Sequence, residues 1–183
     1  WRVPGAPLVM LVDYRQLFCH KNELFYEMWE SFGVDSSQAY GDYDESCIFA
    51  AATGRVIESF YRFHHLESQR VVVHFDEWML GFGLLHLRKY TPRIATLFTT
   101  HATTIGRSIA GNNKPLYGYM SGYNGDGMAA ELHVEAKHSV EKKAAHFADC
   151  FTTVSEITAV ECRQLLDKAP DVVTPNGFEP DFV

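Results

Sequence analysis

The fold is decided by residues 71–111, which read VVVHFDEWMLGFGLLHLRKYTPRIATLFTTHATTIGRSIAG. This stretch contains two short, β-rich and almost wholly apolar runs, residues 71–75 and residues 94–98. Strands that are buried on both faces of a parallel sheet have this composition. Between the two runs Leu84 and Leu87 recur at helical spacing, which predicts a helix that crosses from one strand to the next.

Each predicted strand ends in polar and titratable residues. The first is followed by Asp76 and Glu77, and the second by Thr99, Thr100 and His101. In an open α/β sheet the carboxyl edge is where ligands bind. We therefore expect the two polar segments to lie side by side and to line one crevice.

The rest of the chain also alternates between strand and helix patterns. Gly33 is expected to end an amphipathic helix, Ser155 is a candidate N-cap, and the Gly-, Asn- and Tyr-rich segment 111–131 is expected to form short helices on exposed loops. Further strands are predicted at residues 8–12, 150–154 and 172–174, and further helices at residues 25–32, 48–64, 139–148 and 157–168. Four or five strands that alternate with helices predict a Rossmann-like parallel sheet with helices on both faces and right-handed crossovers.

Bulk composition describes one ordinary globular domain of 183 residues, with 46% hydrophobic and 21% charged residues. The net charge of −7 argues against nucleic acid and against a polybasic membrane contact. The four cysteines have neither CxxC spacing nor a dense framework, so we expect reduced thiols and a cytoplasmic location. The chain begins without an initiator Met, and both of its ends are expected to be cut. Its oligomeric state is left open, a homo-oligomer included.

Each polar residue at the first strand end can be interpreted either as a structural residue or as a functional one. Asp76 and Glu77 precede a helix, so either could complement the helix N-terminus, or accept hydrogen bonds from sugar hydroxyls. His74 comes immediately before the apolar Phe75. A hydrogen-bonded core histidine is its favoured interpretation, and substrate binding is the alternative.

For the second strand end, function is favoured at His101, which lies on a strand-to-helix loop. Thr103 and Thr104 are better explained as helix caps. Arg107 could reach an anionic group or form a surface ion pair. Asn176, in a Pro-Asn-Gly sequence, has the composition of a turn.

The remaining candidates favour structural roles. His138 and His146 are eight residues apart, which is the wrong spacing for a metal pair, so both are interpreted as surface or packing residues. The tyrosines at positions 117, 119 and 123 could stack on sugar rings, but packing is favoured.

Four long motifs resemble the glycogen synthase family of the eukaryotic type, family 3 of the glycosyltransferases. They read HFDEWMLGFGLL, LFTTHATTIGRSIAGN, HSVEKKAAHFADCFTTVSEIT and DVVTPNGF. The resemblance is strongest over residues 71–182 and weaker over residues 8–32. One departure falls on the first motif, because the family strand usually ends in His-Phe-His-Glu-Trp and Asp76 replaces its second histidine.

The resemblance implies that residues 1–183 form most of the N-terminal domain of a two-domain GT-B enzyme. The C-terminal, donor-binding domain of such an enzyme is expected to lie outside this sequence. Such an enzyme transfers glucose from UDP-glucose to the non-reducing end of an α-1,4-glucan, retains the anomeric configuration and needs no metal or other cofactor. The N-terminal domain would contribute to the acceptor and glucosyl side of the cleft, and Asn176 would face that cleft.

We accordingly assign candidate roles to six residues. Asp76 and His101 are the candidate catalytic residues, and His74, Glu77, Arg107 and Asn176 are the candidate substrate-binding residues.

Two other hypotheses remain open. A metal-dependent hydrolase could use His74, Asp76 and His101, which are suitable ligand types at adjacent strand ends. A non-catalytic glucan-binding module is the other.

Overall fold

The computed structural model describes residues 5–177. Within that range the sheet contains four strands, β1 (Val72–Asp76), β2 (Ala95–Thr100), β3 (Cys150–Thr153) and β4 (Val172–Val173). The α-helices are α1 (Lys21–Phe32), α2 (Tyr43–Phe63), α3 (Gly81–Tyr90), α4 (Thr104–Gly111), α5 (Gly125–Glu131), α6 (Glu135–Phe147) and α7 (Glu156–Leu165). Short 3-10 helices occupy Arg15–His20, Leu66–Ser68, Trp78–Leu80 and Tyr117–Gly122.

The four strands are parallel and lie in the order β1-β2-β3-β4, so the predicted Rossmann-like α/β sheet is confirmed. Phe75 pairs with Phe98, and Phe98 with Phe151, and all three side chains are buried. Strands that follow chain order and are joined by right-handed crossovers receive their connecting helices on one face. The three phenylalanines lie on that face, so in the described part of the chain the helices cover one face of the sheet and not both faces as predicted.

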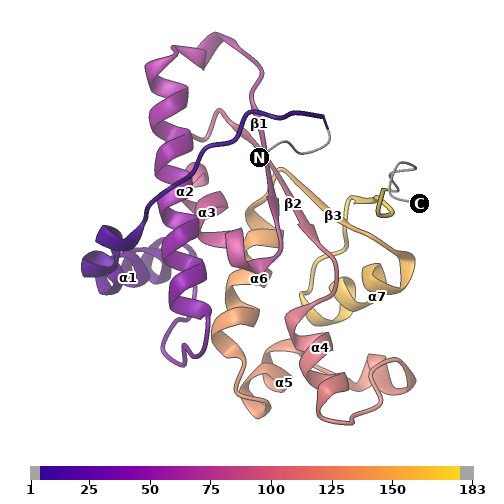
Figure 1. Ribbon diagram of the computed structural model, residues 1–183. Coiled ribbons are helices and arrows are strands. Elements are labelled where there is room, and N and C mark those ends of the chain that lie inside the picture. Colours follow the sequence, from indigo (N-terminus) through magenta and orange to yellow (C-terminus); the bar gives the residue numbers. More distant parts are fainter. Residues whose placement is uncertain (1–4, 178–183) are drawn as a thin grey trace.

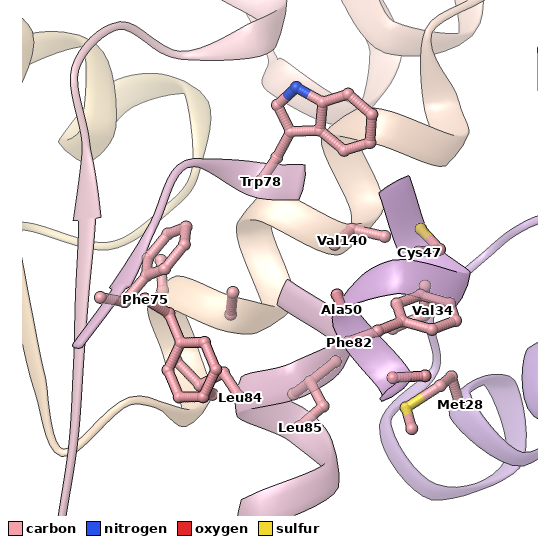
Figure 2. Close-up of a cluster of buried hydrophobic side chains, with 14 of the residues drawn as sticks. Met28, Val34, Cys47, Ala50, Phe75, Trp78, Phe82, Leu84, Leu85 and Val140 are labelled. Atoms are coloured by element: carbon pink, nitrogen blue, oxygen red, sulfur yellow. The ribbon is translucent and has the colours of Figure 1, made fainter. Parts of the chain in front are cut away.

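The main core forms where this face meets α1, α2, α3 and α6 (Figure 2). Phe75 from β1 lies near Leu84 of α3, while Phe82 of the same helix lies beside Met28 of α1 (Figure 2). Gly33 ends α1 as predicted, because its φ of 70° is left-handed and glycine adopts that conformation without a steric penalty.

The predicted strand at residues 8–12 is wrong. In the described part of the chain this segment pairs with no strand, and the exposed fractions of Leu8 and Leu11 are 92% and 95%. Figure 1 shows it as an extended stretch that leads to α1. An apolar, β-rich run becomes a strand only where a partner edge and a covering layer are available, and local composition specifies neither.

The Gly- and Tyr-rich segment is more buried than predicted. Its short helices place Met120, Tyr123 and Met128 in a second apolar cluster with Ile105 and Ile109 of α4. Packing is thus confirmed for Tyr123. The segment therefore supports α4, which lies beyond the carboxyl ends of β1 and β2 (Figure 1).

The two α6 histidines have structural contacts, as predicted. His138 is buried, and its Nε2 donates to Asp126 Oδ1 at 2.8 Å. Nε2 of His146 donates to the carbonyl oxygen of Leu166 at 2.8 Å.

Candidate functional site

The site lies at the carboxyl edge of the sheet, where β1 and β2 end beside each other. Asp76 pairs in register with Thr99, two residues before His101. Nε2 of His101 donates to Asp76 Oδ1 at 2.9 Å, and both side chains are partly exposed. The predicted adjacency of the two polar segments is confirmed. The chemical role of each residue remains a prediction.

Glu77 has a strained backbone, with φ 64° and ψ 162°. This region of φ/ψ space is essentially restricted to glycine and costs roughly 1–3 kcal/mol for other residues, so it persists only where surrounding contacts impose it. Here the backbone N–H of Glu77 donates to the carbonyl oxygen of Thr99 at 2.8 Å. This conformation turns the chain sharply at the end of β1, and the Glu77 side chain reaches the loop between β2 and α4.

The Glu77 carboxylate holds that loop. Its Oε1 accepts from the backbone N–H of His101 at 3.0 Å and from Nη2 of Arg107 at 3.4 Å. Only 15% of the Glu77 side chain is exposed, against 62% for Arg107. These contacts favour a role for Glu77 in positioning, with the more exposed Arg107 as the group better placed to reach a ligand.

Helix capping explains Thr103 but not the acidic pair. The Thr103 hydroxyl accepts from the backbone N–H of Gly106 at 3.0 Å, so Thr103 is the N-cap of α4, as predicted. Thr104 is the first residue of the helix and not a second cap. Neither the 3-10 helix Trp78–Leu80 nor α3 receives a side-chain cap, so Asp76 and Glu77 do not cap the segment that follows them.

Among the described residues, His74 forms no hydrogen bond with this group, and its core interpretation is wrong. Successive strand side chains point to opposite faces, so burial of Phe75 places His74 on the other, more exposed face. There the His74 ring shares a 2.7 Å hydrogen bond with the Thr99 hydroxyl, which shares another of 2.7 Å with the Thr152 hydroxyl.

Asn176 lies just beyond β4 and is exposed. It shares the carboxyl edge with His101. Three strand spacings, roughly 14 Å in all, separate β4 from β1, so a ligand that contacts both strand ends would have to be extended.

Sequence reasoning missed two carboxylates beneath the β2–α4 loop. Glu141 of α6 and Glu161 of α7 are 0% and 3% exposed. The sequence assigns neither residue a role, and the two lysines that follow Glu141 are typical of an exposed helix face. The sequence offered one weak signal, since Glu141 lies one helical turn before Ala144, a small residue of the kind that packs closely on a sheet.

The hydrogen bonds of Glu141 reach both ends of the loop. Its Oε1 accepts from the Thr100 hydroxyl at 2.5 Å, and its Oε2 accepts from the backbone N–H of Thr104 at 2.7 Å. Burial raises the pKa of the Glu141 carboxyl to about 7, against the lowering effect of these donors.

Glu161 binds the middle of the loop. Its Oε2 accepts from the Thr103 hydroxyl at 3.0 Å and from the Thr103 N–H at 3.4 Å, and its Oε1 accepts from the Tyr117 hydroxyl at 2.6 Å. This last hydrogen bond raises the pKa of Tyr117 to about 12.

The hydrolase hypothesis loses its geometric basis. His101 contacts Asp76, but His74 is engaged by Thr99 on the face of the sheet, so the three proposed ligands do not converge. Across residues 5–177, no group of three or more His, Cys, Asp and Glu side chains is arranged to hold a metal ion.

Fold and site together define a Rossmann-like α/β domain that presents a charged ligand edge at the carboxyl ends of its strands. The sequence model of the glycogen synthase family matches residues 1–181. The chain belongs to the glycogen synthase family.

Three relatives illustrate the similarity. The liver glycogen [starch] synthases of Rattus norvegicus and Homo sapiens are each 34% identical over 178 residues, which cover 97% of this chain and 25% of the relative. Glycogen [starch] synthase of Dictyostelium discoideum is 33% identical over 181 residues, 99% of this chain and 20% of the relative. The chain thus spans a fifth to a quarter of the length of these relatives.

Proposed function

We propose that this chain forms one wall of the active site of a retaining glucosyltransferase. The enzyme transfers glucose from UDP-glucose to the non-reducing end of an α-1,4-glucan. Family membership supports the reaction class. The observation that carries the proposal is the Asp76–His101 pair at the carboxyl edge of the sheet, with the exposed Arg107 one turn into the following helix.

His101 is suited to contact the transferred sugar. A carboxylate only accepts hydrogen bonds, so the bond to Asp76 requires that Nε2 of His101 carries a proton. Nδ1 is then left to accept from a ligand, with the ring orientation held by Asp76. We propose this interaction with a glucosyl hydroxyl as the part that His101 plays.

Asp76 replaces the usual family histidine with a group that only accepts. A sugar hydroxyl can donate or accept, so Asp76 can keep a contact at the same place if the direction of one hydrogen bond is reversed. Its second oxygen is available for that contact, since its bond to His101 uses Oδ1.

Arg107 is suited to the diphosphate of the donor. Departure of UDP develops negative charge, and catalysis of this kind rests on positioning and on charge stabilisation. The guanidinium supplies one fixed positive charge at this edge. The remaining groups of the cleft belong, in this proposal, to a second domain.

The proposal includes no metal ion and no other cofactor, and it places the protein in the cytoplasm. All four cysteines are unpaired, which supports a reducing compartment. Within residues 5–177 no helix has the length and apolar character needed to cross a membrane.

The test measures UDP-glucose-dependent elongation of glycogen by the intact protein, together with maltooligosaccharide binding on the same sample. His101→Ala and Arg107→Ala should each lower kcat/KM at least tenfold, while the exposed Glu156→Gln should not. Elongation should persist in EDTA. Binding without turnover would favour the glucan-binding module instead.

A further inference from the structure

Two buried carboxylates converge on one short segment of the site. Glu141 comes from α6 and Glu161 from α7, and both accept hydrogen bonds from residues 100–104. This segment carries His101, and it leads directly into the first turn of α4, which carries Arg107.

A contribution to stability does not by itself explain why these two carboxylates are buried. Removing a carboxylate from water costs several kcal/mol, and apolar replacements of buried charges are often neutral or stabilising. In the described part of the chain neither Glu141 nor Glu161 has a salt-bridge partner within 4.0 Å. Both are satisfied by hydroxyl and backbone N–H donors, most of which belong to the loop they support.

The packing around Glu161 shows how closely the loop is held. A Cβ atom at Gly106 would lie 2.5 Å from Glu161 Oε2 and 2.6 Å from the Thr103 hydroxyl oxygen. Only glycine therefore allows the carboxylate to approach the first turn of α4. Arg107 is the next residue, so this contact holds the backbone from which the exposed Arg107 side chain extends.

We propose that Glu141 and Glu161 are positioning residues, which hold the β2–α4 loop from beneath and thereby set His101 and Arg107 for glucosyl transfer. Glu77 holds the same loop from the side of β1. The part played by His101 and Arg107 in this inference rests on the proposed function, whereas the rigidity of the loop does not.

The experiment uses Glu141→Gln and Glu161→Gln in the intact protein. The glutamine side chain has one acceptor oxygen where the carboxylate has two. In each variant, the donors that bind the replaced oxygen therefore lose their acceptor. Amide hydrogen exchange of the peptide that covers residues 100–107 should accelerate at least tenfold. The kcat for glucosyl transfer should fall about tenfold when measured well below the melting temperature. Glu156→Gln, an exposed change on α7, should leave both values unchanged.

Tyr117→Phe provides a milder variant if the buried substitutions do not fold. It removes one of the donors to Glu161 from a half-exposed side chain, and exchange of the loop should rise several-fold with a smaller fall in kcat.

The outcomes separate positioning from fold stability. A lower melting temperature with unchanged exchange in the loop and unchanged kcat would overturn the proposal, as would faster exchange with unchanged kcat. If the unsubstituted protein shows no glucosyl transfer, the proposed function fails. The exchange measurement would then still decide whether the two carboxylates hold the loop.

Discussion

Among single residues, Asp76 has the contact that changes its expected behaviour most. Its bond to His101 and the missing side-chain cap on the following segment argue against a capping role. Serine caps helices about as well as aspartate but is shorter and uncharged. Substitution by serine therefore distinguishes ligand contact from capping.

We expect Asp76→Ser to keep the melting temperature within a few degrees and to lower kcat/KM about tenfold, because one charge-assisted hydrogen bond is lost. Steady-state kinetics with UDP-glucose would measure this. Asp76→Asn is the matched control, because it keeps an oxygen that accepts from His101 and should lose less. Unchanged kinetics for Asp76→Ser would mean that Asp76 contacts no substrate.

The adjacency of Asp76 and His101 could be predicted, because parallel strands in one sheet bring their carboxyl ends to the same edge. The place of His74 could not be predicted as easily. A strand with consecutive valines gives no clear alternation to show which side chains face the core, and the burial of Phe75 decided the matter. The left-handed conformation of Glu77 also left no mark on the sequence, since surrounding contacts impose it.

At the scale of elements, α4 contains two glycines in opposite situations. A Cβ atom at Gly106 would collide with Glu161 and Thr103, whereas one at Gly111 would meet nothing within 4 Å. The same substitution should therefore have opposite effects at the two ends of one helix.

We expect Gly106→Ala to destabilise the protein by about 1–3 kcal/mol and to lower activity, because the loop must shift to relieve the overlap. Gly111→Ala should leave activity unchanged and raise stability by up to about 1 kcal/mol, since alanine favours helix and restricts the unfolded chain. Urea unfolding and the elongation assay would measure both. Equal effects at the two positions would contradict the close approach of Glu161.

The buried Glu141 on α6 should also make stability depend on pH. Its pKa is raised from 4.5 to about 7, mainly by burial, and the Glu77 charge adds to the shift. Between these pH values the folded chain holds a proton that the unfolded chain has lost. The contribution is therefore fully present below about pH 4.5 and is lost as the pH rises through about 7.

Glu141→Gln should remove this dependence. Between these two pH values, the unfolding free energy of the unsubstituted protein should fall relative to that of the variant by on the order of 3 kcal/mol. Urea titrations at a series of pH values would measure the difference. Parallel curves for the two proteins would show that Glu141 titrates normally.

At the scale of the whole molecule, the proposed chemistry needs more groups than this edge supplies. The chain spans a quarter of the length of its mammalian liver relatives. A polypeptide limited to these 183 residues should therefore show no glucosyl transfer. Elongation of glycogen by that polypeptide would contradict the two-domain proposal.

The sheet and its helices could be predicted because their apolar patterns are local and strong. What could not be predicted depends on partners far along the chain. Residues 8–12 have the composition of a strand but pair with none in the described range. The burial of Glu141 and Glu161 depends on how α6 and α7 pack against the β2–α4 loop. The periodicity of the sequence does not specify that packing.

The hydrogen bonds beneath α4 also determine how this edge meets an anion. In many nucleotide-binding folds a phosphate rests on the partial positive charge at the amino end of a helix. Here the N–H groups of Thr104 and Gly106 are already bonded to Glu141 and Thr103. Above its pKa of about 7, the Glu141 carboxylate also outweighs the half-charge of the helix dipole. A phosphate at this edge must therefore be attracted by the guanidinium of Arg107, whose pull on anions weakens as salt is added.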